Sequence, residues 1–277
     1  MTATVRFGTW NILDGGIDGN VEFRREKQIE ILTALRFDVL AVQELKGWEQ
    51  GNWWRLYELA DACGMKPLPP VTSHVGDGRN HMALLYRPET VRVRDFTPDH
   101  GKGAFHHGLG RARMRINNTE LCVLMTHLAW VDGDKRLAEA RWLTDYAGSF
   151  PGTPGKAVLL GDLNVISNDD PEPDWDEVPT NLHARYRLVQ SDGSFGAFDR
   201  RAMQVLLNAG WVDPQSEVDS PREPTVGHWY PNEPVRQHFD HVLTAGGIST
   251  RSYWTHDTSQ TRVVSDHLPT GLDAEVA

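Results

Sequence analysis

Residues 157–164 read Ala-Val-Leu-Leu-Gly-Asp-Leu-Asn, and this stretch decides which fold the chain of 277 residues adopts. Its apolar run predicts a short strand that is buried on both faces. Two polar side chains follow, and Asp162 and Asn164 point the same way in an extended segment because they lie two residues apart. A core strand has no need of such residues, so the stretch predicts a functional strand end in a layered protein.

The same pattern, an apolar strand bounded by polar residues, recurs along the chain. The polar groups are Thr9-Trp10-Asn11, Gln43-Glu44, Thr126-His127, Asp240-His241 and Ser265-Asp266-His267. Strand ends that meet at one edge of a sheet build a cleft, so we expect these residues to gather at one site.

Strand-like and helix-like segments alternate between these motifs. Helices are predicted over 22–36, 51–62, 134–150 and 199–209, and strands over 5–10, 39–43, 239–243, 251–255 and 270–276. Strands are also predicted over 82–87 and 91–96, on either side of a Pro-Glu-Thr turn, and a hairpin is predicted to join 111–116 to 120–128 across Asn117-Asn118. The mixture predicts mixed or antiparallel sheets covered by helices, in one domain over residues 1–277, because no segment resembles a linker.

Composition excludes several classes of protein. The chain has no apolar run of about 18 residues, the length that a transmembrane helix needs. Two cysteines are too few for a disulfide framework or a four-thiolate zinc site. The first residues carry no basic stretch followed by an apolar one, so we expect no export signal and a cytoplasmic protein.

The net charge of −10 argues against a general nucleic-acid coat protein, because phosphate binding needs local lysine and arginine. However, six acidic residues and no basic one lie within 168–177, a segment that we interpret as a loop. Much of the acidity therefore belongs to one segment, and the charge does not exclude a nucleic-acid substrate.

The polar side chains at the strand ends form a coherent set. Glu44 and Asp266 supply carboxylate oxygens and Asn11 supplies an amide oxygen, which are the ligands that Mg²⁺ or Mn²⁺ prefers. Asp240 can bind one ring nitrogen of His267 and favour its charged form. The set suits metal-assisted displacement at phosphorus, where positioning and charge stabilisation carry most of the catalysis.

The remaining members would act on the substrate itself. One of Asp162 and Asn164 can orient a water molecule while the other holds a phosphoryl oxygen. His127 can donate a hydrogen bond to a phosphate oxygen.

These motifs, in this order from residue 9 to residue 267, resemble the motif set of the endonuclease/exonuclease/phosphatase superfamily. That group includes DNase I and the exonuclease III type of abasic-site endonuclease. The resemblance implies a mixed α/β (α+β) fold, a four-layer α/β/β/α sandwich of two packed mixed sheets flanked by helices. It also implies Mg²⁺, with Mn²⁺ as a substitute, on Glu44 helped by Asn11 and Asp266.

The resemblance further implies a role for each of the other residues. Asp162 would orient the attacking water, and Asn164 and His127 would contact the phosphate. His267, paired with Asp240, would stabilise or protonate the transition state.

The substrate is less well defined by these motifs. Arg236-Gln-His-Phe-Asp240-His241 replaces the Trp-Cys-Asp-Arg signature of the inositol-phosphatase subgroup, which makes that subgroup a poor match. The abasic-site group has an acidic residue two positions after its first Asn, where this chain has Leu13 followed by Asp14. Lys46, two residues after Glu44, does match a lysine of that group and is a candidate to bind substrate.

Two further residues are candidates for substrate binding. Trp48 closely follows Glu44 and would stack on a base or another ring, although a core position is the more common use of tryptophan. Arg113 shares one face of a predicted strand with Arg111 and Arg115, which is either a solvated face or a phosphate-binding one.

From these residues we predict a monomeric, metal-dependent phosphoesterase, and more specifically a phosphodiesterase that acts on nucleic acid or a nucleotide. Two alternatives stay open. One is a phosphomonoesterase or a nucleotide or lipid-headgroup phosphohydrolase on the same fold. The other is a binding protein that keeps the fold without catalysis.

Overall fold

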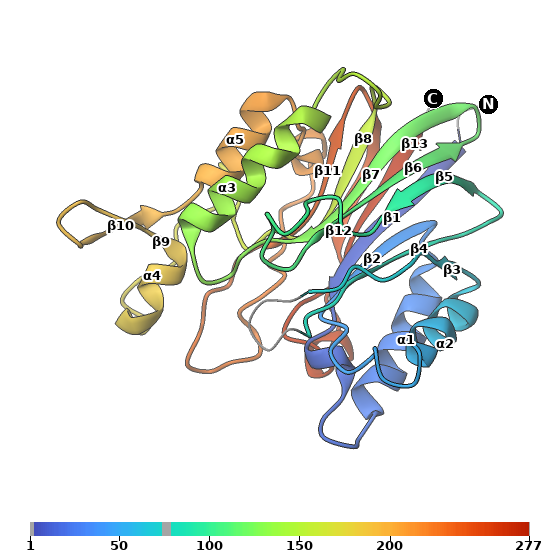
Figure 1. The fold of residues 1–277 in the computed structure, drawn as a ribbon. Coiled ribbons are helices and arrows are strands. Elements are labelled where there is room, and N and C mark those ends of the chain that lie inside the picture. Colours follow the sequence, from blue (N-terminus) through green and yellow to red (C-terminus); the bar gives the residue numbers. More distant parts are fainter. Residues whose placement is uncertain (1–2, 74–78, 277) are drawn as a thin grey trace.

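The computed structural model describes residues 3–73 and 79–276, whose strands form two large sheets and one small ribbon (Figure 1). The first sheet has the order β12 (Ser249–Thr255), β13 (Thr270–Val276), β1 (Ala3–Asn11), β2 (Val39–Gln43), β4 (Ala83–Tyr86) and β3 (Lys66–Pro67). The second has the order β11 (Asp240–Ala245), β8 (Ala157–Asp162), β7 (Thr119–His127), β6 (Leu109–Ile116) and β5 (Val91–Thr97).

The two sheets pack face to face and helices cover their outer faces. The core between the sheets includes Phe7 from β1 and Leu160 from β8. Helices α1 (Phe23–Leu35) and α2 (Trp54–Cys63) bury apolar side chains against the first sheet, and α3 (Gly133–Leu143) and α5 (Arg201–Ala209) do so against the second. This arrangement confirms the predicted four-layer α/β/β/α sandwich. No helix within the described ranges is long and apolar enough to cross a membrane.

Strands β2 and β8 are buried along their whole length, as their apolar runs predict. In β8, Val158 and Leu160 face the other sheet, while Leu159 faces the helices. A strand covered on both faces reads as a continuous apolar run rather than as an alternating one. The polar residues at the end of β8 therefore lie where the other sheet and the helices no longer cover the strand.

Strand direction explains why the motifs meet. β1 runs parallel to β2, with Asn11 opposite Gln43, and β7 runs parallel to β8, with His127 opposite Asp162. β11 runs antiparallel to β8, so Asp240 at its start also lies opposite Asp162. The ends of parallel strands and the starts of antiparallel ones share one edge of a sheet. The polar groups are thus brought to one edge of each sheet, and the two edges meet where Nδ2 of Asn11 donates to Oδ2 of Asp162 at 3.2 Å.

Some segments differ from the prediction. The helix expected over 134–150 ends at Leu143 and continues only as a 3₁₀ turn over Thr144–Tyr146, since glycine and proline are frequent over 148–155. Short elements over 183–198 were not predicted, namely α4 (His183–Tyr186) and a ribbon of β9 (Arg187–Val189) and β10 (Phe195–Phe198). Other 3₁₀ turns span Asp14–Gly16, Thr180–Leu182, Pro214–Glu217 and Thr261–Val263.

The acidic segment 168–177 contains no regular helix or strand, as predicted, but two of its acids are paired. Buried Asp170 lies 2.7 Å from Nε of Arg222, and Glu172 lies 3.1 Å from Nη2 of Arg200. The remaining acids of the segment are exposed to solvent. The local negative potential of this loop is therefore smaller than its composition indicates.

Gly161→Ala is expected to destabilise the protein by about 1–3 kcal/mol through overpacking. A Cβ at this position would lie 1.9 Å from the backbone oxygen of Thr126 on the neighbouring parallel strand. Urea unfolding of both forms measures the effect. Gly148→Ala is the matched control, because nothing lies within 4 Å of a Cβ there. Equal midpoints for wild type and Gly161→Ala would contradict the packing described.

Candidate active site

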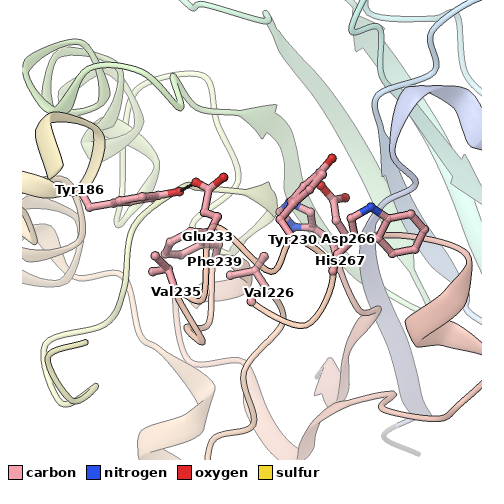
Figure 2. A pocket seen from close by; sticks show the side chains of 10 residues that line it. Tyr186, Val226, Tyr230, Glu233, Val235, Phe239, Asp266 and His267 are labelled. Atoms are coloured by element: carbon pink, nitrogen blue, oxygen red, sulfur yellow. Dashed lines mark hydrogen bonds between the residues drawn. The ribbon is translucent and has the colours of Figure 1, made fainter. Parts of the chain in front are cut away.

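Two of the polar motif residues border a pocket of about 90 Å³ (Figure 2). Asp266 and His267, from the turn before β13, form one side of it. Tyr186 and Glu233 lie at the other side. Asp266 and His267, two of the polar residues predicted from the strand ends, therefore stand beside a space that a small molecule can enter.

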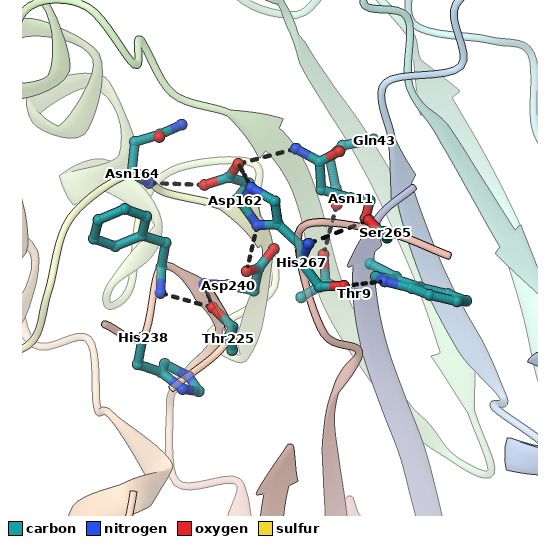
Figure 3. Close-up of polar contacts among 12 residues, drawn as sticks. Thr9, Asn11, Gln43, Asp162, Asn164, Thr225, His238, Asp240, Ser265 and His267 are labelled. Carbon is teal, nitrogen blue, oxygen red and sulfur yellow. Dashed lines mark hydrogen bonds and ion pairs between the residues drawn. The ribbon is translucent and has the colours of Figure 1, made fainter. Parts of the chain in front are cut away.

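His267 is held in one orientation by buried partners. Its Nδ1 lies 2.8 Å from Oδ2 of Asp240, which is fully buried (Figure 3). Its backbone nitrogen donates to Oγ of Ser265 at 3.2 Å, and its backbone oxygen accepts from Nε1 of Trp10 at 2.9 Å. Because Asp240 accepts a hydrogen bond from Nδ1, the other ring nitrogen, Nε2, is turned toward Asp162 and the pocket.

The carboxylates around His267 favour its charged form. Burial acts to lower the pKa of His267, but the negative charges of Asp240 and Asp162 outweigh it and raise the pKa well above its usual value. We therefore expect His267 to carry a proton on both nitrogens near neutral pH.

Asp162 occupies the centre of the site. Its Oδ2 lies 3.3 Å from Nε2 of His127 and 3.6 Å from Nε2 of His267. The same oxygen accepts from Nδ2 of Asn11 at 3.2 Å, and Oδ1 accepts from the backbone nitrogen of Asn164 at 3.0 Å. The side chain is almost fully buried. A carboxylate fixed in this way is placed to hold a water molecule and take its proton.

Asn164 follows the strand with a left-handed backbone, with φ of 50°, which asparagine tolerates better than most residues. Its side-chain nitrogen donates to the backbone oxygen of Leu128 at 3.1 Å. This contact ties the end of β8 to the residue after His127. The pair predicted to contact phosphate is thus held together by the backbone.

A cluster of carboxylates lies on the other side of Asp162. Oε1 of Glu44 accepts from Nδ2 of Asn11 at 3.0 Å, and Oε2 accepts from the backbone nitrogen of Asp14 at 3.1 Å. The pKa of Asp266 is raised to about 7, chiefly by burial and also by the charges of Glu44 and Asp162, against the opposing effect of His267. Oδ1 of Asp266 is buried and has no hydrogen-bond partner among the described residues.

These features fit a divalent cation. A hard cation such as Mg²⁺ or Mn²⁺ is bound by carboxylate oxygens, and its charge would offset the repulsion among the acids. It would also satisfy the unpartnered oxygen of Asp266. A second group of potential ligand atoms, from Asp162, Asp240 and His267, lies within 4.8 Å, but Asp240 and His267 already bind each other there.

Asn11 stays a predicted metal ligand, and the structure shows which side chains it contacts. Its side-chain nitrogen faces both Glu44 and Asp162, and its side-chain oxygen accepts from the backbone nitrogen of Leu13 at 3.1 Å. In this structure Asn11 therefore orients two carboxylates, and its oxygen is engaged with the loop that follows β1.

Two of the predicted substrate-binding residues do not reach the site. Trp48 is only 1% exposed and donates from Nε1 to the backbone oxygen of Gly15, so it packs in the core rather than stacking on a substrate. Arg113 lies on the outer face of β6 and pairs with Asp95 and Glu120 at 3.6 and 3.3 Å. Its neighbour on β7 is Cys122, well before His127, so this interpretation was also wrong.

Lys46 stays close to the proposed metal ligands. Its Nζ lies 3.0 Å from Oδ1 of Asp14, the residue whose backbone nitrogen binds Glu44. It lines a polar groove together with Asn20 and Arg55. Its binding of substrate stays a prediction.

Several supporting residues carried no clear sequence signal. Oγ1 of Thr225 accepts from the backbone nitrogen of Asp240 at 3.3 Å, although it lies in an irregular segment. The ring of His107 packs 4.3 Å from that of His127. Glu139 is fully buried on α3 and accepts from the backbone of Ala129 at 2.9 Å. Of these residues only His107 stood out in the sequence, as one of two adjacent histidines, and that pattern alone indicated no role for it.

The two packed sheets and their helices form a four-layer sandwich, and a buried Asp–His centre lies at the ends of its strands. Together these two features are typical of the phosphoesterase type. The chain belongs to the Endonuclease/Exonuclease/phosphatase family, whose model matches residues 8–267. Members of this family are hydrolytic phosphoesterases and in general depend on a metal. No curated protein matches the sequence.

Solved structures share the fold at low sequence identity. An AP endonuclease from Archaeoglobus fulgidus is 19% identical with a TM-score of 0.65, over 98% of this chain and 100% of that one. D. rerio TDP2 complexed with single-strand DNA product is 15% identical with a TM-score of 0.65, over 99% and 100%. A mannosyl-6-phosphatase from Bacteroides thetaiotaomicron is 12% identical with a TM-score of 0.62, over 98% and 99%. These likenesses concern the fold alone.

Proposed function

We propose that the protein hydrolyses a phosphoester with the help of a divalent cation, Mg²⁺ with Mn²⁺ as a substitute. One observation carries the proposal, namely the position of the buried Asp162 carboxylate. It lies within 3.6 Å of Nε2 of both His127 and His267, on the border of the acidic cluster. This arrangement supports a site in which a base for water stands beside donors for phosphate oxygens and ligands for a cation.

The residues divide the reaction among them. Asp162 takes a proton from the attacking water as its oxygen bonds to phosphorus, and the ester P–O bond breaks on the opposite side. Charged His267, held by Asp240, stabilises the developing negative charge and gives a proton to the departing oxygen. His127 and Asn164 hold phosphoryl oxygens. Glu44 and Asp266 would hold the cation, which would supply charge neutralisation at the phosphate.

The substrate predicted from the sequence is a phosphodiester in nucleic acid, and the likeness to an AP endonuclease and to TDP2 supports it. The pocket favours a second candidate, a small phosphoester, because it is confined and its lining includes Glu233 and Asp266 but no lysine or arginine among the described residues. Every predicted catalytic and metal-binding position holds a residue suited to its role, which argues against a non-catalytic binding protein. We also propose that the protein is monomeric, is cytoplasmic and has one domain.

Glu44→Gln is expected to weaken Mn²⁺ binding by about tenfold or more, because removing one charged ligand takes away a main source of attraction. Isothermal titration measures the affinity. Glu217→Gln, at an exposed turn, is the matched control. Circular dichroism of both variants is expected to match the wild type. Wild-type affinity in Glu44→Gln would contradict the assignment of the cation to this residue.

The pH dependence of the same titration tests Asp266. A carboxyl group with a pKa of about 7 is protonated below that pH, and the cation binds only the ionised form. Mn²⁺ affinity of the wild type is therefore expected to rise as the pH increases toward 7 and to level off above it. Binding should release protons, which titrations in buffers of different ionisation enthalpy detect.

A further inference from the structure

The pocket beside His267 has walls of two kinds. Four aromatic side chains line it, Tyr186, Trp229, Tyr230 and Phe239. Its ionisable lining consists of Glu233 at one side and Asp266 and His267 at the other (Figure 2). Since Asp266 and His267 belong to the proposed reaction centre, the space between them and Glu233 is where the part of the substrate attached to the phosphate would lie.

Glu233 is held by two neighbouring side chains. The Tyr186 hydroxyl donates to its Oε1, and Nη1 of Arg185 lies 3.5 Å from the same oxygen. Arg185 is itself engaged, with its guanidinium 4.7 Å from the ring of Trp130. The other carboxylate oxygen, Oε2, receives no hydrogen bond from any residue in the described ranges. Oε2 is thus an available acceptor on a side chain that its neighbours hold in place.

The lining argues against two kinds of occupant. A second phosphate, as in a continuing nucleic-acid strand, needs a cation, and the described lining provides two carboxylates and no lysine or arginine. The edge of a nucleobase is read by side chains that both donate and accept, such as Asn and Gln, and neither lines the pocket in the part of the chain that is described. The pocket, with a volume of about 90 Å³, has room for a small ring.

We propose that this pocket binds the alcohol part of the substrate as a small, uncharged group bearing hydroxyls, as in a sugar phosphate or a polyol phosphate. Glu233 accepts a hydrogen bond from one of these hydroxyls, which a carboxylate does well because it accepts only. The rings of Tyr230 and Phe239 cover the carbon-bound hydrogens. This inference rests on the proposed function and makes Glu233 and Tyr186 specificity-determining residues.

The test compares substrates within one enzyme. Wild type and Glu233→Ala are assayed with Mg²⁺ on glucose 6-phosphate, glycerol 3-phosphate, phenyl phosphate and a single-stranded oligonucleotide. Phenyl phosphate has a ring of similar size but no hydroxyl to bind. In Glu233→Ala, kcat/KM for glucose 6-phosphate relative to phenyl phosphate is expected to fall about tenfold, mainly through KM, which corresponds to about 1.4 kcal/mol.

Two further variants keep the test decisive. Tyr186→Phe removes the hydroxyl that holds Glu233 and is expected to lower the same ratio in the same direction. Glu217→Ala is the matched control on the surface. An unchanged ratio in both pocket variants, or a wild type that prefers the oligonucleotide to the small esters, overturns this inference and leaves the proposed function standing. Absence of turnover on every ester overturns both.

Discussion

His267→Ala is expected to lower kcat for phosphoester hydrolysis by about 10²–10⁴-fold, the usual contribution of a positioned acid–base group. The imidazole lies 2.8 Å from Asp240 and 3.6 Å from Asp162, so its loss removes the charged donor from the centre of the site. The fold should survive, because the side chain borders an open pocket. Steady-state rates with a fixed Mg²⁺ concentration measure the effect.

The pH profile separates this role from a structural one. Buried His267 has a pKa raised well above its usual value because Asp240 and Asp162 outweigh the effect of burial. Its proton, and the rate that depends on it, is retained at neutral pH and lost as the pH rises through that raised value. His267→Ala should lack this alkaline limb. His256→Ala, outside the pocket, is the control, and an unchanged rate in His267→Ala would remove His267 from the mechanism.

Asp162→Asn is expected to lower kcat by about 10³-fold, within the range of a lost general base. The amide is close to isosteric and can still accept from the backbone of Asn164, which lies 3.0 Å away. It cannot take a proton from water. The substitution also removes the negative charge of Asp162, which lies close to both His127 and His267. Rates measured under single-turnover conditions report the chemical step directly.

Asp192→Asn, in the exposed turn between β9 and β10, is the matched control for this substitution. Thermal unfolding of both variants shows whether the fold is kept. An Asp162→Asn enzyme that retains more than about a tenth of the wild-type rate would contradict the role of Asp162 as base, because that loss is smaller than such a base contributes.

The fold was predictable where burial leaves a pattern in the sequence. The apolar run before Gly161 and the hairpin at Asn117-Asn118 are both found as predicted. The elements over 183–198 were missed because they are short and contain no run of apolar residues. Their packing depends on residues far away, as in the small cluster that joins Tyr186 and Phe239.

The site was predictable from motifs at strand ends, and less so from single residues. Asp162 and Asp240 lie opposite each other because β8 and β11 are paired in the sheet, so their positions at the strand ends bring them together. Trp48 and Arg113 were misplaced because nearness in sequence says little about which face a side chain takes. Glu233, from an irregular segment, reaches the pocket through tertiary packing alone.

Product analysis with and without metal tests the central claim most directly. The purified protein is stripped of metal and incubated with single-stranded DNA, nucleotides, sugar phosphates and phenyl phosphate, first with EDTA and then with Mg²⁺ or Mn²⁺. We predict hydrolysis of at least one phosphoester that requires the cation and is lost in Asp162→Asn. Hydrolysis that is undiminished by EDTA, or no turnover of any phosphoester with either cation, would contradict the account.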